Sequence, residues 1–299
     1  MILHLAVFLA GWTGVFGRLI TLSGLPLVWH RMWVSVATLG LVLALTHRLH
    51  RVGWKALLKI GGCGAILATH WVAFFASIQL SNVSIGVACV ATSCFFTTLF
   101  NPLINRKRIS WAEVLISFIS IAGVLLIFSL DVRYRIGIVL GLTCAALYSV
   151  FSILNVNVSK ETGEDSATML LYELIGGVLF LTLCMPLYAY IFEGTGVRGC
   201  VGARIILKEW MPSSADFLWL ILLGSVFTVL PFLFQLQALV KLSPFSVSLA
   251  YNLEPVYSIA IAAILFGELR EVNFSFWLGI SLIVISVLIQ TFRVMRDEG

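Results

Sequence analysis

Charged residues are scarce in this sequence of 299 residues. Only 11% are Asp, Glu, Lys or Arg, against about 25% in an ordinary soluble domain. Apolar residues make up 60% of the chain. This composition excludes a soluble globular protein and predicts an all-α integral membrane protein.

Signatures of catalysis and of metal or nucleotide binding are also missing. The sequence has no Walker-type phosphate loop, no HExxH zinc motif and no GxSxG nucleophile motif. It also has no CxxC spacing. We therefore expect no metal, no cofactor and no ATP-driven pumping. An intramembrane enzyme built from scattered residues such as His70 and Glu254 is the least favoured function.

Cysteine is used mainly inside apolar runs, so the thiols are interpreted as structural. The six residues are Cys63, Cys89, Cys94, Cys144, Cys184 and, in a connecting segment, Cys200.

Ten apolar runs have about the length of a helix that spans a bilayer, which is roughly 20 residues. They cover approximately residues 1–20, 25–47, 55–80, 83–105, 110–130, 136–157, 166–192, 215–240, 244–267 and 273–293. The first run lacks the basic start and cleavage site of a signal peptide, so we interpret it as a retained helix.

The net charge of +5 comes from short basic clusters between the apolar runs. That placement indicates membrane orientation rather than binding to nucleic acid. More of the basic residues fall on the side of the two termini, which are therefore expected to be cytoplasmic. The residues on that side are Arg48, Arg51, Lys55, Lys59, Arg106, Lys107, Arg108, Lys160, Lys241, Arg293 and Arg296.

An internal repeat divides the chain into two halves. A shift of 162 residues aligns about 57–128 with about 219–290. We therefore expect five-helix repeats at 1–135 and 136–299, with 194–214 as an extended external connection. Because five crossings are an odd number, the second repeat must be inverted relative to the first. Inverted repeats are typical of secondary transporters that bind substrate near the membrane midplane.

Glu254 is the main candidate for a functional residue, because an ionisable side chain inside a spanning helix is costly unless it is paired or hydrated. It lies in the stretch Tyr251, Asn252, Leu253, Glu254, Pro255. Pro255 cannot donate a hydrogen bond to the carbonyl of Tyr251. We assign Tyr251, Asn252 and Glu254 to a substrate cavity; a bond to a partner helix or a buried water is the structural alternative for the glutamate.

Five further residues are assigned to the same cavity. His70 and Phe74 share one helix face and Trp71 lies on the adjoining face, which makes a wall suited to organic solutes. Arg31 offers a charge for a carboxylate or phosphate, or snorkels to lipid headgroups. Gln235 bonds either a solute or a neighbouring helix.

Gating or interface roles are assigned to Glu173, Pro255 and Glu268. Glu173 precedes two glycines and is either a gate or a helix-end anchor. Pro102, Pro186 and Pro231 are expected to interrupt three further helices, and interrupted helices indicate binding sites in transporters.

The chain resembles the EamA-type branch of the drug/metabolite transporter superfamily, which comprises bacterial exporters with ten helices. The residues that carry the resemblance are His4–Val7, Gly11–Gly14, Trp29–Arg31, Ser81–Val87, Leu253–Pro255 and Phe266–Glu268. In the family, a proline and a following glutamate recur in both halves. Here the 162-residue shift places Ser93 at Pro255 and Arg106 at Glu268, so the pattern transfers only to the second half.

The resemblance implies ten helices in a basket, with helices 5 and 10 at the periphery, in a bacterial inner membrane. It also implies export of amino acids or other small organic metabolites. We therefore expect a secondary transporter that works by alternating access on a metabolite, with Glu254 contacting the solute or a coupled proton. A flippase for lipids or lipid-linked carriers and an uncoupled facilitator or channel remain alternatives, and the sequence leaves the oligomeric state open.

Overall fold

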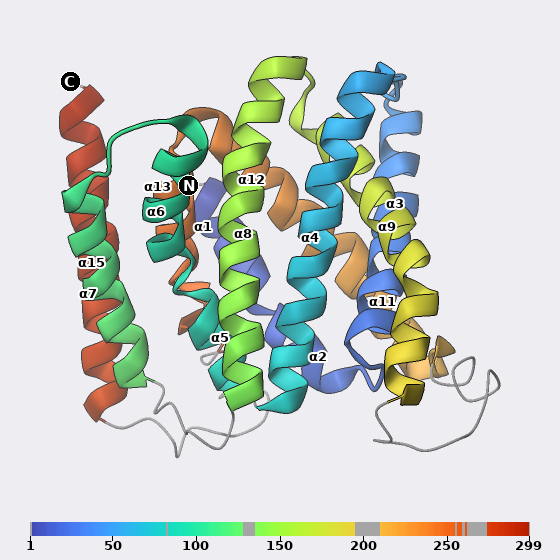
Figure 1. Cartoon of the computed structure of the whole chain (residues 1–299), viewed down its shortest axis with the longest axis horizontal. Helices are drawn as coiled ribbons and strands as arrows, with labels where there is room; N and C mark the ends of the chain where they lie inside the picture. The colour runs from blue at the N-terminus through green and yellow to red at the C-terminus, as the bar shows by residue number, and fades with distance from the viewer. Residues whose placement is uncertain are drawn as a thin grey trace.

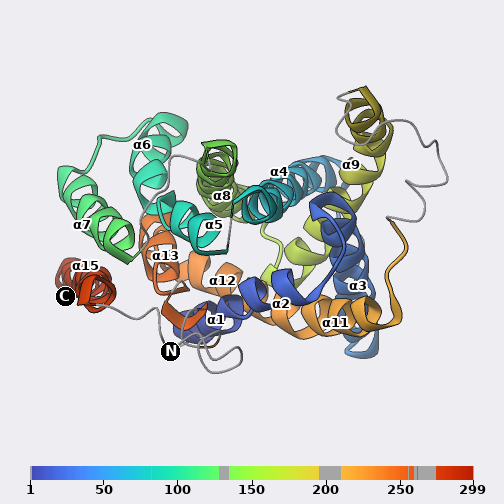
Figure 2. The ribbon, with the colours of Figure 1, turned by 90° about the horizontal axis from the view of Figure 1, so that it is seen from below.

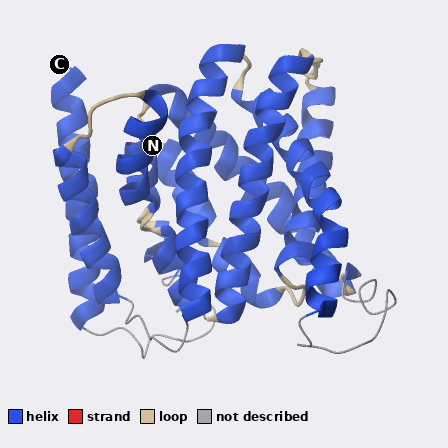
Figure 3. Ribbon diagram, viewed as in Figure 1, coloured by secondary structure: helices blue, strands red, loops and turns tan. Residues whose placement is uncertain are grey.

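The structure is a computed structural model that describes residues 2–81, 83–127, 135–194, 210–254, 256–258, 261 and 274–298. All regular structure in these residues is helical (Figure 3). The helices are α1 (Ile2–Gly11), α2 (Thr13–Leu19), α3 (Gly24–Leu45), α4 (Trp54–Leu80), α5 (Val83–Val90), α6 (Ser93–Asn105), α7 (Trp111–Ile127), α8 (Arg135–Thr162), α9 (Ser166–Gly194), α11 (Ser214–Gly224), the π-helix η2 (Ser225–Val229), α12 (Leu230–Lys241), α13 (Pro244–Tyr251) and α15 (Phe274–Glu298).

Five stretches of the described chain are long and apolar enough to cross a membrane. They are Gly24–Leu45, Trp54–Leu80, Arg135–Thr162, Ser166–Met185 and Ser214–Lys241. Of the other apolar runs, 1–20 and 83–105 each form a pair of short helices, 110–130 contains the 17-residue helix α7, and 273–293 lies, from residue 274 on, in the 25-residue helix α15. The run 244–267 is described only in part. The expected all-α membrane fold is confirmed.

Several of the apolar runs are interrupted, but not at the residues expected. The run 1–20 breaks at Trp12, and the run 83–105 breaks at residues 91–92. Pro102, in contrast, lies inside the continuous helix α6. The expectation that proline marks the interruptions is therefore wrong for α6. It is also wrong for Pro186, which lies within the continuous helix α9.

Pro231 has a different local effect. It lies in the first turn of α12, and it has no N–H to donate to the carbonyl of Phe227. The chain forms the π-helix Ser225–Val229 immediately before it. Short π-helical segments inside α-helices are frequent at functional sites.

Corresponding helices of the two repeats run in opposite directions. In Figure 1, α1 and α2 run downward and α8 runs upward, while α3 runs upward and α9 downward. We call the top of this view, which carries the loops 46–53 and 163–165, the upper end. Figures 1 and 2 place α7 and α15 together at one side of the molecule, where they pack against each other.

The repeats interlock rather than lying side by side. Helix α4 of the first repeat packs against α8 and α9 of the second, and α1 packs against α12. One large apolar core runs through these helices. The sequence boundary near residue 135 is therefore no boundary between two separate bodies in space.

Helices α4 and α9 are in backbone contact. A Cβ atom built on Gly64 would lie 1.9 Å from the carbonyl oxygen of Glu173. One built on Gly176 would lie 2.5 Å from the Cα atom of Gly61. Small residues allow such close approach between membrane helices, where packing contributes much of the association.

We predict that Gly64→Ala lowers the thermal stability of the purified protein, because the new methyl group would overlap backbone that cannot move alone. Overpacking of this kind costs about 1–3 kcal/mol. The matched control is Gly62→Ala on the same helix, since a Cβ there meets nothing within 4 Å. A thermal unfolding midpoint for Gly64→Ala equal to that of Gly62→Ala would contradict the backbone contact.

Candidate functional site

A cavity of about 50 Å³ lies in the centre of the helix assembly. Its lining comes from both repeats: Ala10, Thr13, Arg31, His70, Trp71, Phe74 and Val90 from the first, and Tyr148, Phe232, Gln235, Tyr251 and Glu254 from the second. Seven of the eight residues assigned to a substrate cavity from the sequence are in this lining; the exception is Asn252.

Helix interruptions surround the cavity. Ala10 and Thr13 flank the break between α1 and α2, Val90 ends α5, and Tyr251 ends α13 just before Glu254. Irregular backbone at membrane depth is tolerated only where protein or a water-filled cavity satisfies its polar groups. The breaks therefore fit a polar cavity better than a continuous apolar core.

Arg31 is buried, with only 2% of the residue exposed, and two contacts fix its position. Its Nε atom donates a 2.7 Å hydrogen bond to Thr228 Oγ1, which belongs to the π-helix. Its guanidinium carbon lies 4.1 Å from the centre of the Trp71 ring, a cation–π arrangement. Arg31 Nη1 is buried without a hydrogen-bond partner, so this positive group has a donor to offer.

Glu254 supplies the opposite charge. Both residues line the cavity, and they interact electrostatically. Among the described residues, no ion pair within 4.0 Å joins their charged atoms. The cavity is therefore lined by a basic and an acidic side chain that do not form a direct ion pair.

Three other lining residues, Gln235, Tyr148 and Tyr251, carry free polar atoms. Gln235 is fully buried, and both its amide oxygen and its amide nitrogen lack a hydrogen-bond partner. The hydroxyl groups of Tyr148 and Tyr251 are also buried and unpartnered. An unsatisfied buried donor or acceptor costs about 1–3 kcal/mol. Water or a solute in the cavity would remove this penalty.

Aromatic rings form the rest of the wall. Trp71 meets Phe232 edge to face, with ring centres 4.9 Å apart. His70 lies 5.3 Å from the Tyr148 ring, and its Nδ1 atom is 2.9 Å from the carbonyl oxygen of Cys144. Since a carbonyl only accepts, the His70 Nδ1 atom carries the proton and Nε2 is left for other contacts.

Asn252 lies away from the cavity. Its amide nitrogen donates to the hydroxyl of Ser120 and lies 3.4 Å from the sulfur of Cys94. Tyr251 and Glu254 are three residues apart and share a face, whereas adjacent residues of a helix do not. The structure therefore does not place Asn252 with the other seven residues.

The three residues assigned to gating or interface roles have different outcomes. Pro255 and Glu268 lie outside the described residues. Glu173 is 0% exposed and accepts a hydrogen bond from Asn155, so it is neither at a helix end nor at the surface.

Sequence reasoning did not single out Thr228, Tyr148, Phe232 or Thr13. One signal was available for Tyr148: Tyr148, Ser152 and Asn155 recur at i, i+4 and i+7, which is a polar stripe on an otherwise apolar helix. In the described part of the chain, no group of three or more His, Cys, Asp or Glu side chains is placed so that it could hold a metal ion.

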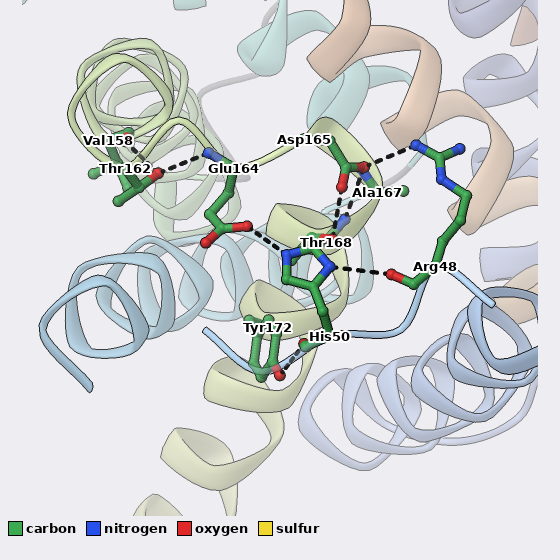
Figure 4. A network of polar contacts seen from close by, with 9 residues as sticks. All are labelled: Arg48, His50, Val158, Thr162, Glu164, Asp165, Ala167, Thr168 and Tyr172. Carbon is green, nitrogen blue, oxygen red and sulfur yellow. Dashed lines mark hydrogen bonds and ion pairs between the residues drawn. The ribbon is translucent and has the colours of Figure 1, made fainter. Parts of the chain in front are cut away.

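A second polar cluster ties the repeats together at the upper end (Figure 4). Arg48 forms an ion pair with Asp165 at 3.5 Å, and His50 Nε2 lies 2.8 Å from Glu164. The Tyr172 hydroxyl donates to the backbone carbonyl of His50. We call these five residues the upper-end network.

The network favours the charged form of His50. Its Nδ1 atom lies 3.1 Å from the carbonyl oxygen of Arg48, and its Nε2 atom faces the Glu164 carboxylate, so both ring nitrogens meet acceptors. The hydrogen bond with Glu164, followed by that with Arg48, raises the pKa of His50. Asp165 differs in that partial burial raises its pKa, but hydrogen bonds from Thr168 and Ala167 outweigh this and lower it overall.

Comparison with known proteins gives one family match and a structural match. The model of the EamA-like transporter family matches residues 1–129 and again residues 135–292. A solved crystal structure superposes with a TM-score of 0.72 over 97% of this chain and 96% of the other, at 16% sequence identity. At that identity the likeness concerns the fold alone. No curated protein matches the sequence significantly.

We predict that the upper-end network weakens as the pH rises. Because the pKa of His50 is raised, its contribution is full below the ordinary histidine value of about 6.5 and is lost as the pH rises through the raised pKa. Hydrogen exchange at residues 163–168, corrected for the chemical rate, should speed up over that range. His50→Gln should abolish the pH dependence, while His47→Gln, outside the network, should keep it. Identical profiles in wild type and His50→Gln would refute the assignment.

Proposed function

Because the chain belongs to the EamA-like transporter family, we propose that it is a secondary transporter that exports an amino acid or another small organic metabolite by alternating access. Family membership makes it a membrane transporter. The substrate class and the direction rest on the chemistry of the central cavity and on the orientation expected from the basic residues.

The observation that carries the proposal is the set of polar atoms left without partners around the cavity. Arg31 Nη1, the Gln235 amide and the Tyr251 hydroxyl are buried and unpartnered, and Glu254 lines the same cavity. A zwitterionic solute satisfies these groups: its carboxylate accepts from Arg31 and its ammonium group donates to Glu254. The amide of Gln235 can both donate to the solute and accept from it.

The aromatic wall fits the apolar part of such a solute. Trp71 and Phe232 pack edge to face, and Phe74 continues the wall along α4. Pockets of this kind are mostly apolar with a few convergent polar groups that fix orientation. The wall accepts many side chains, so charge recognition contributes more to selection than the wall does.

The cavity is too small in this conformation to hold a complete small molecule. About 50 Å³ is far below the roughly 300–1,000 Å³ of pockets that hold a complete small molecule. Binding must therefore widen the cavity. The interrupted helices at Trp12, at residues 91–92 and after Tyr251 are the natural places for that movement.

We propose that the upper end is cytoplasmic and that the membrane is a bacterial plasma membrane. Basic residues at that end include Arg48, Lys59 and Lys160, and loops rich in Lys and Arg remain on the cytoplasmic side.

Counterflow in proteoliposomes tests the function. Vesicles loaded with one unlabelled solute from a panel of amino acids and small metabolites should take up the labelled form of that solute transiently. Glu254→Gln should lower the initial rate about tenfold or more, since a hydrogen bond to a charged group contributes about 1.5–3 kcal/mol. The fold should be kept, because the substitution changes the volume little.

The matched control is Glu113→Gln. Glu113 lies on the peripheral helix α7 and pairs with Arg293 at 3.8 Å, so its loss should leave the rate unchanged. Equal counterflow in wild type and in folded Glu254→Gln would contradict the assignment of the site. Movement of labelled lipid in place of any solute would favour a flippase, and a chemically altered product would favour an enzyme.

A further inference from the structure

Glu173 is a buried carboxyl group that the central cavity does not use. It lies on α9 and is 0% exposed. The Asn155 amide of α8 donates to its Oε1 atom, and its Oε2 atom is buried without a hydrogen-bond partner. Among the ion pairs between described residues, none includes Glu173.

Helix α4 packs closely against the main chain of α9 at Glu173. The backbone of α4 at Gly64 is in contact with the backbone of Glu173, where even a methyl group would overlap. An ionised carboxylate that is buried without a cation carries a large free-energy penalty. A proton on Oε2 neutralises the carboxylate and leaves one hydroxyl group as a hydrogen-bond donor.

A small cavity leads from Asn155 toward the upper end. It has a volume of about 60 Å³ and lies between α8, α9 and α12. Asn155, Ser159 and Lys160 line it along α8, and Ser166 lines it at the start of α9. Five residues of helix separate Asn155 from the exposed Lys160, which is about 7.5 Å. The cavity has room for a few water molecules and polar groups to hold them.

Helix α12 separates this cavity from the central one. Gln235 lines the central cavity, and the next residue, Leu236, lines the smaller cavity. A movement of α12 that widens the central cavity therefore changes the space beside Asn155 as well. The two sites share a structural element through which they can influence each other.

We propose that Glu173 is a second ligand site of this transporter, and that its ligand is a proton exchanged with the cytoplasm through the cavity beside Asn155. Glu173 does not line this cavity itself, but Asn155, which bonds it, does. In the step, a hydronium ion that enters through the cavity gives its proton to a carboxylate oxygen of Glu173 and becomes water, and the reverse transfer regenerates hydronium on release. The coupling of this step to transport rests on the proposed function. The protonation itself does not.

Few other groups influence the site. The Cys63 thiol of α4 interacts electrostatically with Glu173, the Asn155 amide is neutral, and Lys160 on α8 lies at the far end of the cavity. Lys59 is paired with Glu161 at the surface. A pH-dependent change in the carboxyl infrared band at this position therefore reports on Glu173. The Cys63→Ala variant checks whether the thiol contributes to that change.

Infrared difference spectroscopy tests the protonation without any solute. At neutral pH, the wild-type protein should show the C=O band of a protonated carboxyl that is absent from Glu173→Gln and retained in Glu113→Gln. Asn155→Ala keeps Glu173 but removes the donated hydrogen bond, so the band should move to higher frequency. Absence of the band from the wild-type spectrum would overturn the proposal, as would its persistence in Glu173→Gln.

Transport measurements test the coupling. In proteoliposomes, Glu173→Gln should keep counterflow, which needs no net proton movement. Accumulation driven by an imposed pH gradient should fall by about fivefold or more, within the range expected for coupling between two sites. Glu113→Gln should behave as wild type in both assays.

The outcomes separate the two proposals. Absence of counterflow in the wild-type protein would contradict the proposed function. The infrared result would then still show whether Glu173 is protonated. If Glu173→Gln keeps counterflow and also accumulates solute under a pH gradient as well as the wild type does, the proton site at Glu173 is wrong and the proposed function stands. If Glu173→Gln fails to fold, the band shift in Asn155→Ala decides whether Glu173 is protonated.

Discussion

Backbone contact between α4 and α9 is the constraint on which the rest of the arrangement depends. Glycines at positions 61, 64 and 176 let two spanning helices from different repeats touch, in a membrane where packing and hydrogen bonds must replace the hydrophobic effect. One side of α4 is thus fixed against α9 and Glu173. About two turns further along the same helix, His70, Trp71 and Phe74 reach the central cavity. A single helix therefore positions both buried polar sites.

The two sites show how this chain manages polar groups away from water. In the central cavity, Arg31 and several neutral groups keep free hydrogen-bonding atoms beside the acidic Glu254. Free atoms of this kind are costly in an empty cavity and favourable in an occupied one. At Glu173, a single acidic group has one neutral donor and one free oxygen. The first pattern suits a solute with several functional groups, and the second suits a proton.

Much of the fold and of the cavity could be predicted from the sequence, because a segment that spans a bilayer must be apolar and must satisfy its backbone hydrogen bonds internally. Apolar runs predicted the helices, and ionisable residues inside those runs, such as Arg31 and Glu254, mark the cavity. Prediction failed where three-dimensional contact decides: the breaks lie at Trp12 and residues 91–92 instead of at Pro102, and Asn252 faces Ser120. Thr228 was missed because its role depends on a π-helix that aims its hydroxyl at Arg31. Glu173 was found, but its burial against glycine backbone was not foreseen.

The central claim is that the cavity between the inverted repeats opens to each face of the membrane in turn. Thr13 lines that cavity, so a single cysteine at this position, in a chain whose six native cysteines are replaced, reports its access directly. The account predicts that a membrane-impermeant maleimide modifies Thr13→Cys from either face of oriented vesicles, and that a transported solute slows both reactions. Modification from one face only, whichever way the solute gradient is imposed, would contradict alternating access at this site.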